Sequence, residues 1–245
     1  MRVYASHPWI TPKISKDTCK WVVELIEQGF NAIKLSLSQF QNFGKNVKED
    51  LKYIKEIRDA AGYGVDLMVS DSARHNVSKA INISKRLEEY DLLFYEDPIP
   101  RGDIEGYVKL TAAVDLPIEA GEEMTNEMLR NFILRRVVDA INPDVAQHGG
   151  LSESKKIADL AHALGIQDYP HAYWSAISTA ANLHLTASMP DGYLMEYRVS
   201  DPDPSMEEIL MKPLKFEKGY VEVPKKPGLG IELNRKVVNK IKWKG

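Results

Sequence analysis

The chain has 245 residues, of which 44% are hydrophobic and 27% are charged, and its formal net charge is −3. This composition predicts a globular protein with a sizeable core, and the slight negative charge argues against a nucleic-acid partner. No apolar run reaches the length of about 18 residues that a membrane-spanning helix needs. The single cysteine, Cys19, excludes an internal disulfide bond, which suits a protein of the cytoplasm.

The predicted strands are short apolar runs that end in polar or charged residues. In chain order they are "RVYAS" (2–6), "NAIKLS" (31–36), "VDLMVSD" (65–71), "LLFYEDPIP" (92–100), "LPIEAGE" (116–122), "DAINPD" (139–144), "GIQDYPH" (165–171) and "GYLMEY" (192–197). The prolines of the fourth run end it, because proline has no N–H group with which to continue a strand.

Segments with helical periodicity lie between these strands. They are "KDTCKWVVELIEQG" (16–29), "NVSKAINISKRLEEYD" (76–91), "SESKKIADLAHALG" (152–165) and "SAISTAANLHLTASMP" (175–190). In the first of them, Trp21, Val22 and Leu25 share one face. Asn76 is a predicted N-cap and Gly165 is a predicted C-cap.

Strands and helices therefore alternate eight times with short loops, which predicts an α/β fold with a parallel sheet covered by helices. Eight such units in roughly 210 residues fit a (β/α)8 barrel of the TIM type. A doubly wound sheet is the alternative, but no glycine-rich phosphate loop follows the first strand. We expect a single domain over residues 1–245, with the barrel at about 1–212 and a C-terminal extension at 213–245.

Carboxylates end two neighbouring predicted strands at a regular interval. Ser70, Glu96 and Glu122 are separated by 26 residues each (96 − 70 and 122 − 96), which is one strand–helix unit. Strand ends meet at the mouth of a barrel, so Glu96 and Glu122 should face each other there. Two such carboxylates repel each other unless they are protonated or bridged by a cation, and oxygen ligands suit Mg²⁺. The alternative interpretation is a pair of solvated acids on the rim.

Six motifs in this order resemble the barrel domain of the enolase superfamily, in its mandelate racemase/muconate-lactonizing enzyme group. They are "FNAIKLS", "LLFYEDPIP", "IEAGEE", "INPDVAQHGGLSE", "YPHAYWSAISTAANLHL" and "KPGLGIEL". The resemblance implies an enzyme that binds a carboxylate substrate to Mg²⁺ and removes the proton next to that carboxylate. The metal stabilises the enediolate charge that develops in such a reaction.

The resemblance also implies roles for single residues. Glu96 and Glu122 match two metal ligands, while His171 matches a general base or acid and Asp144 matches its orienting partner. This pairing is chemically reasonable, because an imidazole exchanges protons near neutral pH and a carboxylate fixes its tautomer.

Three further positions belong to the implied catalytic and substrate-binding set. Lys34 matches the first of two lysines on strand two, and Ser36 stands in place of the second, which is often a base. Glu196 matches a residue that hydrogen-bonds the substrate carboxylate or enediolate. Its alternative interpretation is an acid of the mouth that pairs with Arg198 or Lys34. Serine has no useful basicity, so the loss of the second lysine argues against two-base racemisation and leaves one-base dehydration open.

The third metal ligand of the family is an aspartate on strand three, where this chain has Ser70. Asp71 is the predicted substitute, provided that the backbone bulges or turns at the strand end and brings it inward. Ser72 stands where the family often has an asparagine. His75 could serve as a second acid, although we expect a solvated loop histidine there.

The implied function is a Mg²⁺-dependent lyase, a sugar-acid dehydratase-like enzyme that acts on a small carboxylate. The alternatives are a degenerate barrel that acts as a subunit or binding scaffold, and a racemase or cycloisomerase. The sequence begins at the first barrel strand, so we expect that the family's N-terminal α+β cap is a separate polypeptide, or that the chain is a fragment, or that the barrel stands alone. We therefore expect a separate cap subunit or a second copy to cover the apolar residues of the C-terminal segment. These are Phe216, Tyr220, Val221, Val223, Leu229, Ile231 and Leu233.

Overall fold

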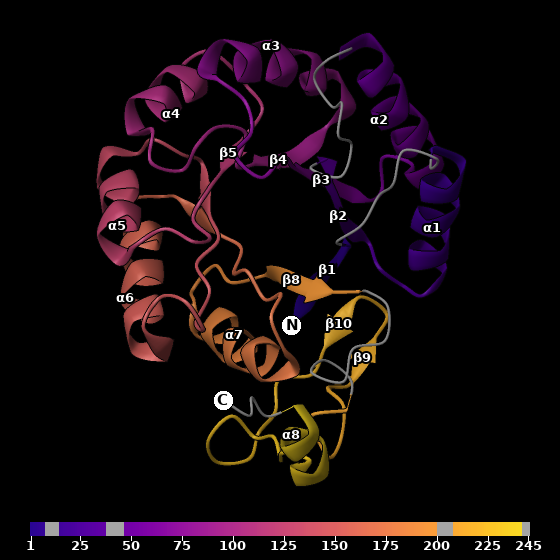
Figure 1. Ribbon diagram of the computed structural model, residues 1–245, viewed down its shortest axis with the longest axis vertical. Coiled ribbons are helices and arrows are strands. Elements are labelled where there is room, and N and C mark those ends of the chain that lie inside the picture. Colours follow the sequence, from indigo (N-terminus) through magenta and orange to yellow (C-terminus); the bar gives the residue numbers. More distant parts are fainter. Residues whose placement is uncertain (8–14, 38–46, 200–207, 242–245) are drawn as a thin grey trace.

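The computed structural model describes residues 1–7, 15–37, 47–199 and 208–241. A ring of helices surrounds an inner ring of parallel strands, as the alternating pattern predicts (Figure 1). The eight inner strands are β1 (Arg2–His7), β2 (Ala32–Ser36), β3 (Asp66–Ser70), β4 (Leu92–Glu96), β5 (Ile118–Glu119), β6 (Ala140–Ile141), β7 (Gln167–Asp168) and β8 (Leu194–Arg198). The fold is therefore an α/β barrel.

The helices of the outer ring follow the strands in turn. They are α1 (Ser15–Glu27), α2 (Val47–Ala61), α3 (Val77–Leu87), α4 (Ile104–Thr111), α5 (Asn126–Arg135), α6 (Gly150–Ala163) and α7 (Ala176–Ser188), with a short 3-10 helix at Glu88–Tyr90. Among the helices of the described residues, none combines the length and the apolar character that crossing a membrane requires.

The sheet closes on itself through β1, which pairs in parallel with both β2 and β8. Each strand from β2 to β6 pairs in parallel with the next one. The N–H of Glu196 donates to the carbonyl of Pro170 over 3.1 Å and so links β8 to the segment after β7. Ser36, Ser70 and Glu96 are successive register partners across β2, β3 and β4, which places these strand ends at one level.

A buried apolar cluster fills the barrel below these strand ends. It takes one residue from each of seven strand segments: Tyr4, Ala32, Met68, Phe94, Ala140, Tyr169 and Leu194. The rings of Phe94 and Tyr169 stack at 5.2 Å, and Tyr4 meets Phe94 edge-on at 6.3 Å. The packed interior keeps the polar groups at the mouth, where the strands end.

The predicted helices correspond to α1, α3, α6 and α7. Asn76 caps α3 as predicted, because its side chain accepts the N–H of Lys79 over 2.9 Å. At the end of α6 the cap is Leu164, one residue before the predicted Gly165. Gly165 takes the left-handed φ of 72° that follows many helix ends.

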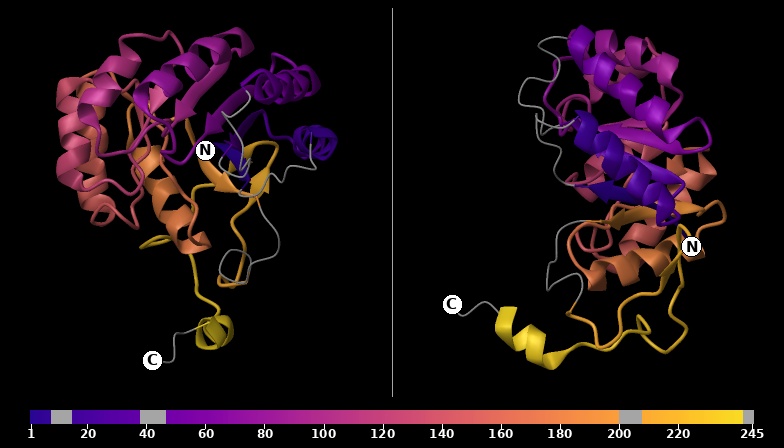
Figure 2. Two further views of the ribbon diagram at one scale, coloured as in Figure 1. Left: turned by 45° about the horizontal axis from the view of Figure 1, so that its top comes forward. Right: turned by 90° about the vertical axis from the view of Figure 1, so that its right-hand side faces the viewer.

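The C-terminal segment adds a hairpin and a helix to the barrel: β9 (Phe216–Glu217), β10 (Tyr220–Val221) and α8 (Arg235–Ile241). β10 pairs with the start of β1 in antiparallel fashion, and α8 lies at the edge of the molecule (Figure 2), where Val238 joins an apolar cluster that includes Ala176 of α7. A Cβ at Gly29, whose φ is 103°, would lie 2.6 Å from the Cα of Lys218, so this glycine lets the hairpin approach closely.

The hairpin covers part of the apolar C-terminal segment for which the sequence predicted cover by another chain. Val221 is fully buried, and Phe216 stacks on Phe30 at 4.4 Å. Tyr220, by contrast, is 52% exposed. The expectation that these residues are partly stranded without a covering chain was therefore wrong for Val221, because the hairpin joins the sheet beside β1, whereas Phe216 is half-buried.

Candidate functional site

The strand ends and the loops after them enclose a cavity of about 300 Å³. Its lining contains every predicted catalytic and substrate-binding residue except Asp144, which contacts the ring of His171 without lining the cavity. The lining residues are Ser6, Lys34, Ser36, Ser70, Ser72, Glu96, Glu122, Glu123, Gln147, His171, Tyr173, Trp174 and Glu196. Polar groups from β1 to β4 and from β8 thus converge with groups from the loops after β5, β6 and β7.

Lys34 forms the floor of the cavity together with two buried carboxylates. Its ammonium lies 2.8 Å from Glu96 and 3.1 Å from Glu196. Burial acts to lower the pKa of Lys34, but these two carboxylates outweigh it and hold that pKa well above its usual value. Asn142 also donates to Glu96 over 2.6 Å. The contact between Glu196 and Lys34 matches the alternative expectation for Glu196, and it leaves a role toward substrate open.

His171 and Asp144 form the hydrogen bond that the sequence predicted, with Nδ1 and Oδ2 2.9 Å apart. The other oxygen of Asp144 accepts from the N–H of Ala146 at 2.8 Å and from Ser178 and Asn182 at 3.1 Å each. Burial acts to raise the pKa of Asp144, but these donors and His171 hold it below its usual value. A carboxylate fixed in this way orients the imidazole ring.

The other ring nitrogen of His171 turns toward the cavity. Its Nε2 lies 3.1 Å from Glu122 and 3.6 Å from Glu196. Burial acts to lower the pKa of His171, but Glu196, Asp144 and Glu122 raise it to about 9. Glu196 responds in the opposite direction: burial raises its pKa, while Lys34 and His171 bring it down to about 2. The site therefore favours an imidazolium at His171 that faces an ionised Glu196.

Three carboxylates could together hold a metal ion: Glu96 and Glu122 of the cavity lining and the buried Asp97 each offer one oxygen within 4.8 Å of the others. Asp97 is fully buried, and its Oδ1 has no hydrogen-bond partner. Burial raises the pKa of both Asp97 and Glu122, and the neighbouring carboxylates add to the effect. Arg101 reaches Asp97 at 2.6 Å and Glu122 at 2.5 Å.

Asp71, the predicted third ligand, lies outside this cluster. Its buried carboxylate contacts Arg74 at 2.8 Å, Tyr95 at 2.7 Å and His75 at 2.5 Å. The strand end thus keeps Asp71 on the side that alternation gives it, and its carboxylate is not one of the three that lie together in this cluster. The expectation of a solvated His75 was wrong, because that residue is only 5% exposed.

Several residues of the site were not predicted from the sequence. Asp97 and Asn142 stand inside quoted motifs, next to or two residues before a predicted site residue. Alternation along the predicted strand 139–144 could have found Asn142, since residues two apart on a strand face the same side, although β6 itself ends at Ile141. Arg101, Tyr173 and Trp174 lie in loops, where no periodic pattern indicates the direction of a side chain.

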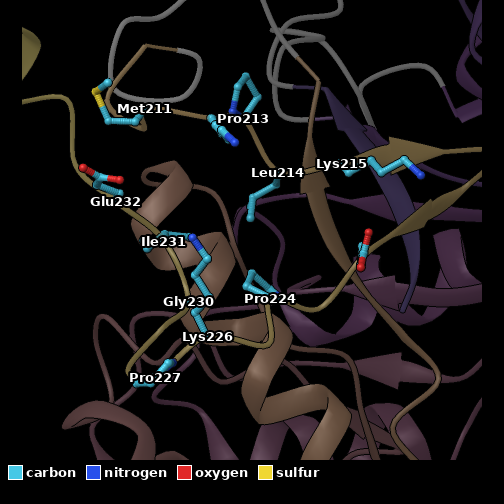
Figure 3. Close-up of a pocket in the computed structure, with 12 residues that line it drawn as sticks. Met211, Pro213, Leu214, Lys215, Pro224, Lys226, Pro227, Gly230, Ile231 and Glu232 are labelled. Atoms are coloured by element: carbon cyan, nitrogen blue, oxygen red, sulfur yellow. The ribbon is translucent and has the colours of Figure 1, made fainter.

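A larger cavity of about 520 Å³ lies in the C-terminal segment, and it shares no lining residue with the first (Figure 3). Apolar side chains such as Leu214, Pro224 and Ile231 border it, together with charged ones such as Lys226 and Glu232. The residues that line this cavity include no cluster of acid and base groups comparable to that at the strand ends. The smaller cavity is therefore the candidate catalytic site.

Comparison with known proteins identifies the family to which the chain belongs. The chain is 30% identical over 227 residues to D-gluconate dehydratase from Thermoproteus tenax, which covers 89% of this chain and 44% of that protein. It is 29% identical over 249 residues to D-galactarolactone cycloisomerase from Agrobacterium fabrum, which covers 96% of this chain and 63% of that protein. The chain thus spans about half to two thirds of the length of these relatives.

A solved structure shares the whole described architecture. Mandelate racemase/muconate lactonizing enzyme from Jannaschia sp. CCS1 has a TM-score of 0.88 and 27% identity, over 100% of this chain and 66% of that one. Residues 17–237 match the family described as enolase C-terminal domain-like. Since this match covers most of the chain, the protein belongs to the enolase C-terminal domain-like family, within the enolase superfamily.

Proposed function

We propose that the chain provides the catalytic barrel of a Mg²⁺-dependent sugar-acid dehydratase-like lyase. The observation that supports this most is the His171–Asp144 pair, in which the other ring nitrogen of His171 faces Glu122 at 3.1 Å inside the cavity. A base and a group of carboxylate ligands within one cavity are what removal of a proton next to a carboxylate requires. The dehydratase named among the relatives makes sugar acids the first substrates to test.

The residues present fit a divalent cation. Glu96, Asp97 and Glu122 supply the hard oxygen ligands that Mg²⁺ prefers, and a buried oxygen of Asp97 lacks a hydrogen-bond partner. The raised pKa values of Asp97 and Glu122 reflect burial and mutual repulsion, which a bound cation would relieve. We propose these three residues as the ligands, with Arg101 holding Asp97 and Glu122 in position.

In the proposed reaction, His171 accepts the α-proton at Nε2 while Asp144 holds the ring through Nδ1. Mg²⁺, when bound, would stabilise the negative charge that develops on the substrate carboxylate. The imidazolium then donates its proton to the departing β-hydroxyl, so that the C–H and C–O bonds break, water leaves and an enol forms. The enol becomes a 2-keto-3-deoxy acid. Lys34 and Glu196 at the floor orient the carboxylate end of the substrate.

The wall opposite His171 argues against a racemase that uses two bases. Serine, not a basic residue, ends β2 at Ser36 and β3 at Ser70. A binding scaffold is the second candidate, and the contacts of Arg101 and Lys34 favour it, because protein cations already pair with Glu122 and Glu96. In a scaffold, these cations would take the place of the metal.

Incubation of the full chain with Mg²⁺ and a panel of aldonic acids distinguishes the two candidates. The lyase proposal expects a 2-keto-3-deoxy acid to form from at least one of them, and chelation of the metal to stop its formation. Absence of product from every aldonic acid, with Mg²⁺ present in excess, would favour the scaffold.

A further inference from the structure

The helix α7 holds the carboxylate that orients the proposed base. Ser178 and Asn182 on this helix both donate to one oxygen of Asp144, each over 3.1 Å. Asn182 is fully buried, and its own side-chain oxygen accepts the N–H of Val145 over 3.2 Å. The helix therefore fixes both the side chain of Asp144 and the backbone that follows it.

The C-terminal segment packs against the middle of this helix through Leu229. This half-buried side chain lies on an apolar cluster that contains Ala181 and Leu185 of α7 together with Val145. In addition, Nε2 of His184 donates to the carbonyl of Leu229 over 3.2 Å. The residue that follows Asp144 and the helix that holds Asp144 thus share one apolar cluster with the C-terminal segment.

A second contact between the C-terminal segment and α7 lies at the start of the helix. Ala176 belongs to another apolar cluster, on which Leu214 and Ile231 of the C-terminal segment pack. Leu214 and Ile231 also border the larger cavity (Figure 3). The C-terminal segment therefore contacts α7 on both sides of Ser178, at Ala176 and at Ala181.

A shift of α7 would disturb the orientation of the proposed base. The bonds from Ser178 and Asn182 to Asp144 are 3.1 Å long, so a displacement of about 1 Å would break them. His171 bonds the other oxygen of Asp144 over 2.9 Å, so its ring follows the carboxylate. A misplacement of about 1 Å, even when its cause is remote, can slow a reaction about 10²-fold.

We infer that the C-terminal segment is a positioning element for the proposed base: Leu229 and His184 hold α7 where it fixes Asp144. The role of the dyad in this inference rests on the proposed function. No described residue of the C-terminal segment lines the catalytic cavity, so the effect passes through packed side chains and hydrogen bonds. Loss of the Leu229 side chain should therefore lower kcat and leave KM within about twofold.

Solvent exchange of the His171 ring proton tests this coupling without any turnover. NMR of the full chain with isotope-labelled histidine identifies the Nδ1–H signal of His171 by its absence from the His171→Asn variant. Leu229→Ala should accelerate exchange of this proton about 5- to 100-fold, which is the effect of losing the two bonds from α7. For an aldonic acid that the wild type dehydrates, kcat should fall by a similar factor.

Two control variants keep the test specific. Leu229→Met conserves most of the side-chain volume and should retain the slow exchange. Ile81→Ala removes a half-buried apolar side chain from α3, which lies across the barrel from α7 (Figure 1), and it should leave exchange of the His171 proton unchanged. Thermal unfolding of each variant, compared with that of the parent, checks that the fold is intact.

A double-mutant cycle tests the route of the coupling. Asn182→Ala removes one bond to Asp144 and should itself accelerate exchange of the His171 proton. If Leu229 acts through α7, adding Leu229→Ala to this variant should accelerate exchange by no more than about twofold further. Ser178→Ala takes the place of Asn182→Ala in the cycle if the latter does not fold.

The outcomes separate the inference from the proposed function. Equal exchange in the parent and Leu229→Ala would overturn the inference, even if the wild-type chain dehydrates sugar acids. Equal acceleration by Leu229→Ala and Ile81→Ala would overturn it too, because the effect would then be a general loosening of the fold. Additive effects in the cycle would exclude the route through α7. Selective, non-additive acceleration in a chain that dehydrates no acid would support the coupling and overturn the lyase. Absence of an Nδ1–H signal of His171 from the parent would overturn the bond to Asp144 and the inference with it.

Discussion

The three carboxylates around His171 determine the orientation of its ring and its pKa. Asp144 fixes one ring nitrogen at 2.9 Å, while Glu122 and Glu196 face the other at 3.1 and 3.6 Å. These charges raise the pKa of His171 to about 9 against the effect of burial. Only the neutral ring can accept a proton, so proton abstraction should become faster as the pH rises toward that value.

Asp144→Asn should shift this pH profile. The amide removes one of the negative charges that raise the pKa of His171, so the rise in rate should occur at lower pH than in the wild type. The maximal rate should fall about 10²-fold or more, because the ring loses its orienting acceptor. The rate of α-proton exchange measured against pH checks both effects. An unchanged midpoint would show that Asp144 does not set the pKa of His171.

Metal binding should depend on Asp97 and not on Asp71. Removing one charged ligand should weaken Mg²⁺ binding by about 1–3 kcal/mol, which is roughly 5- to 150-fold. We expect Asp97→Asn to show that loss by calorimetry, Glu122→Gln to abolish binding, and Asp71→Asn to bind nearly as the wild type does. The reverse order of Asp97→Asn and Asp71→Asn would return Asp71 to the ligand set.

Most of the charged residues that line the cavity were expected there from the sequence. The two acids that the sequence did not place correctly, Asp97 and Asp71, share one physical cause. The strand–helix interval predicted that Glu96 and Glu122 face each other, and the resemblance implied the pairing of Asp144 with His171. Asp97 and Asp71 could not be placed, because alternation holds only within a strand. Asp97 has a φ of 46°, and Ser72, just after Asp71, has a φ of 51°. Such left-handed turns redirect side chains in a way that sequence periodicity does not reveal.

At the scale of elements, β7 holds a buried acid whose function the site does not explain. Both carboxylate oxygens of Asp168 lack a hydrogen-bond partner, and the residue is 7% exposed. Burial, with Asp191 nearby, raises the pKa of Asp168 well above its usual value. The folded state therefore binds this proton more tightly than the unfolded state does.

Asp168→Asn should stabilise the protein at neutral and alkaline pH. Since the folded pKa is raised, the wild type loses stability as the pH climbs above the unfolded value of about 4, by up to about 1.4 kcal/mol per unit. The variant lacks this loss, so the difference in unfolding free energy should grow with pH and vanish near pH 4. Urea unfolding at several pH values measures it, with the exposed Asp159→Asn as control. A difference independent of pH would contradict the argument.

The strands and four of the helices could be predicted because each has a clear period or cap. The hairpin of β9 and β10 could not, since its two-residue strands lack the polar strand end and the following helix that mark the equally short β5, β6 and β7 in the sequence. Its place beside β1 depends on the close approach at Gly29, which is a tertiary contact between distant parts of the sequence.

On the scale of the whole molecule, the C-terminal cavity of about 520 Å³ is the surface that another chain should cover. Stable association buries at least about 1,000 Å². We expect light scattering after size-exclusion chromatography to show a second copy, or a cap subunit when one is co-expressed. Leu214→Glu should abolish that association, whereas Leu134→Glu, at a position 60% exposed on α5, should not. A monomer that binds no apolar dye would contradict this expectation.

The most direct test of the proposed chemistry is exchange of the α-proton with deuterated solvent. Proton NMR follows the α-proton signals of a panel of aldonic acids, including D-gluconate, in D₂O with Mg²⁺ and the wild-type chain or its His171→Asn variant. We expect at least one signal to decay with the wild type, and to decay about 10²-fold more slowly or not at all with the variant. Equal exchange by both chains, or no exchange of any acid by the wild type, would contradict the assignment of His171 as the base.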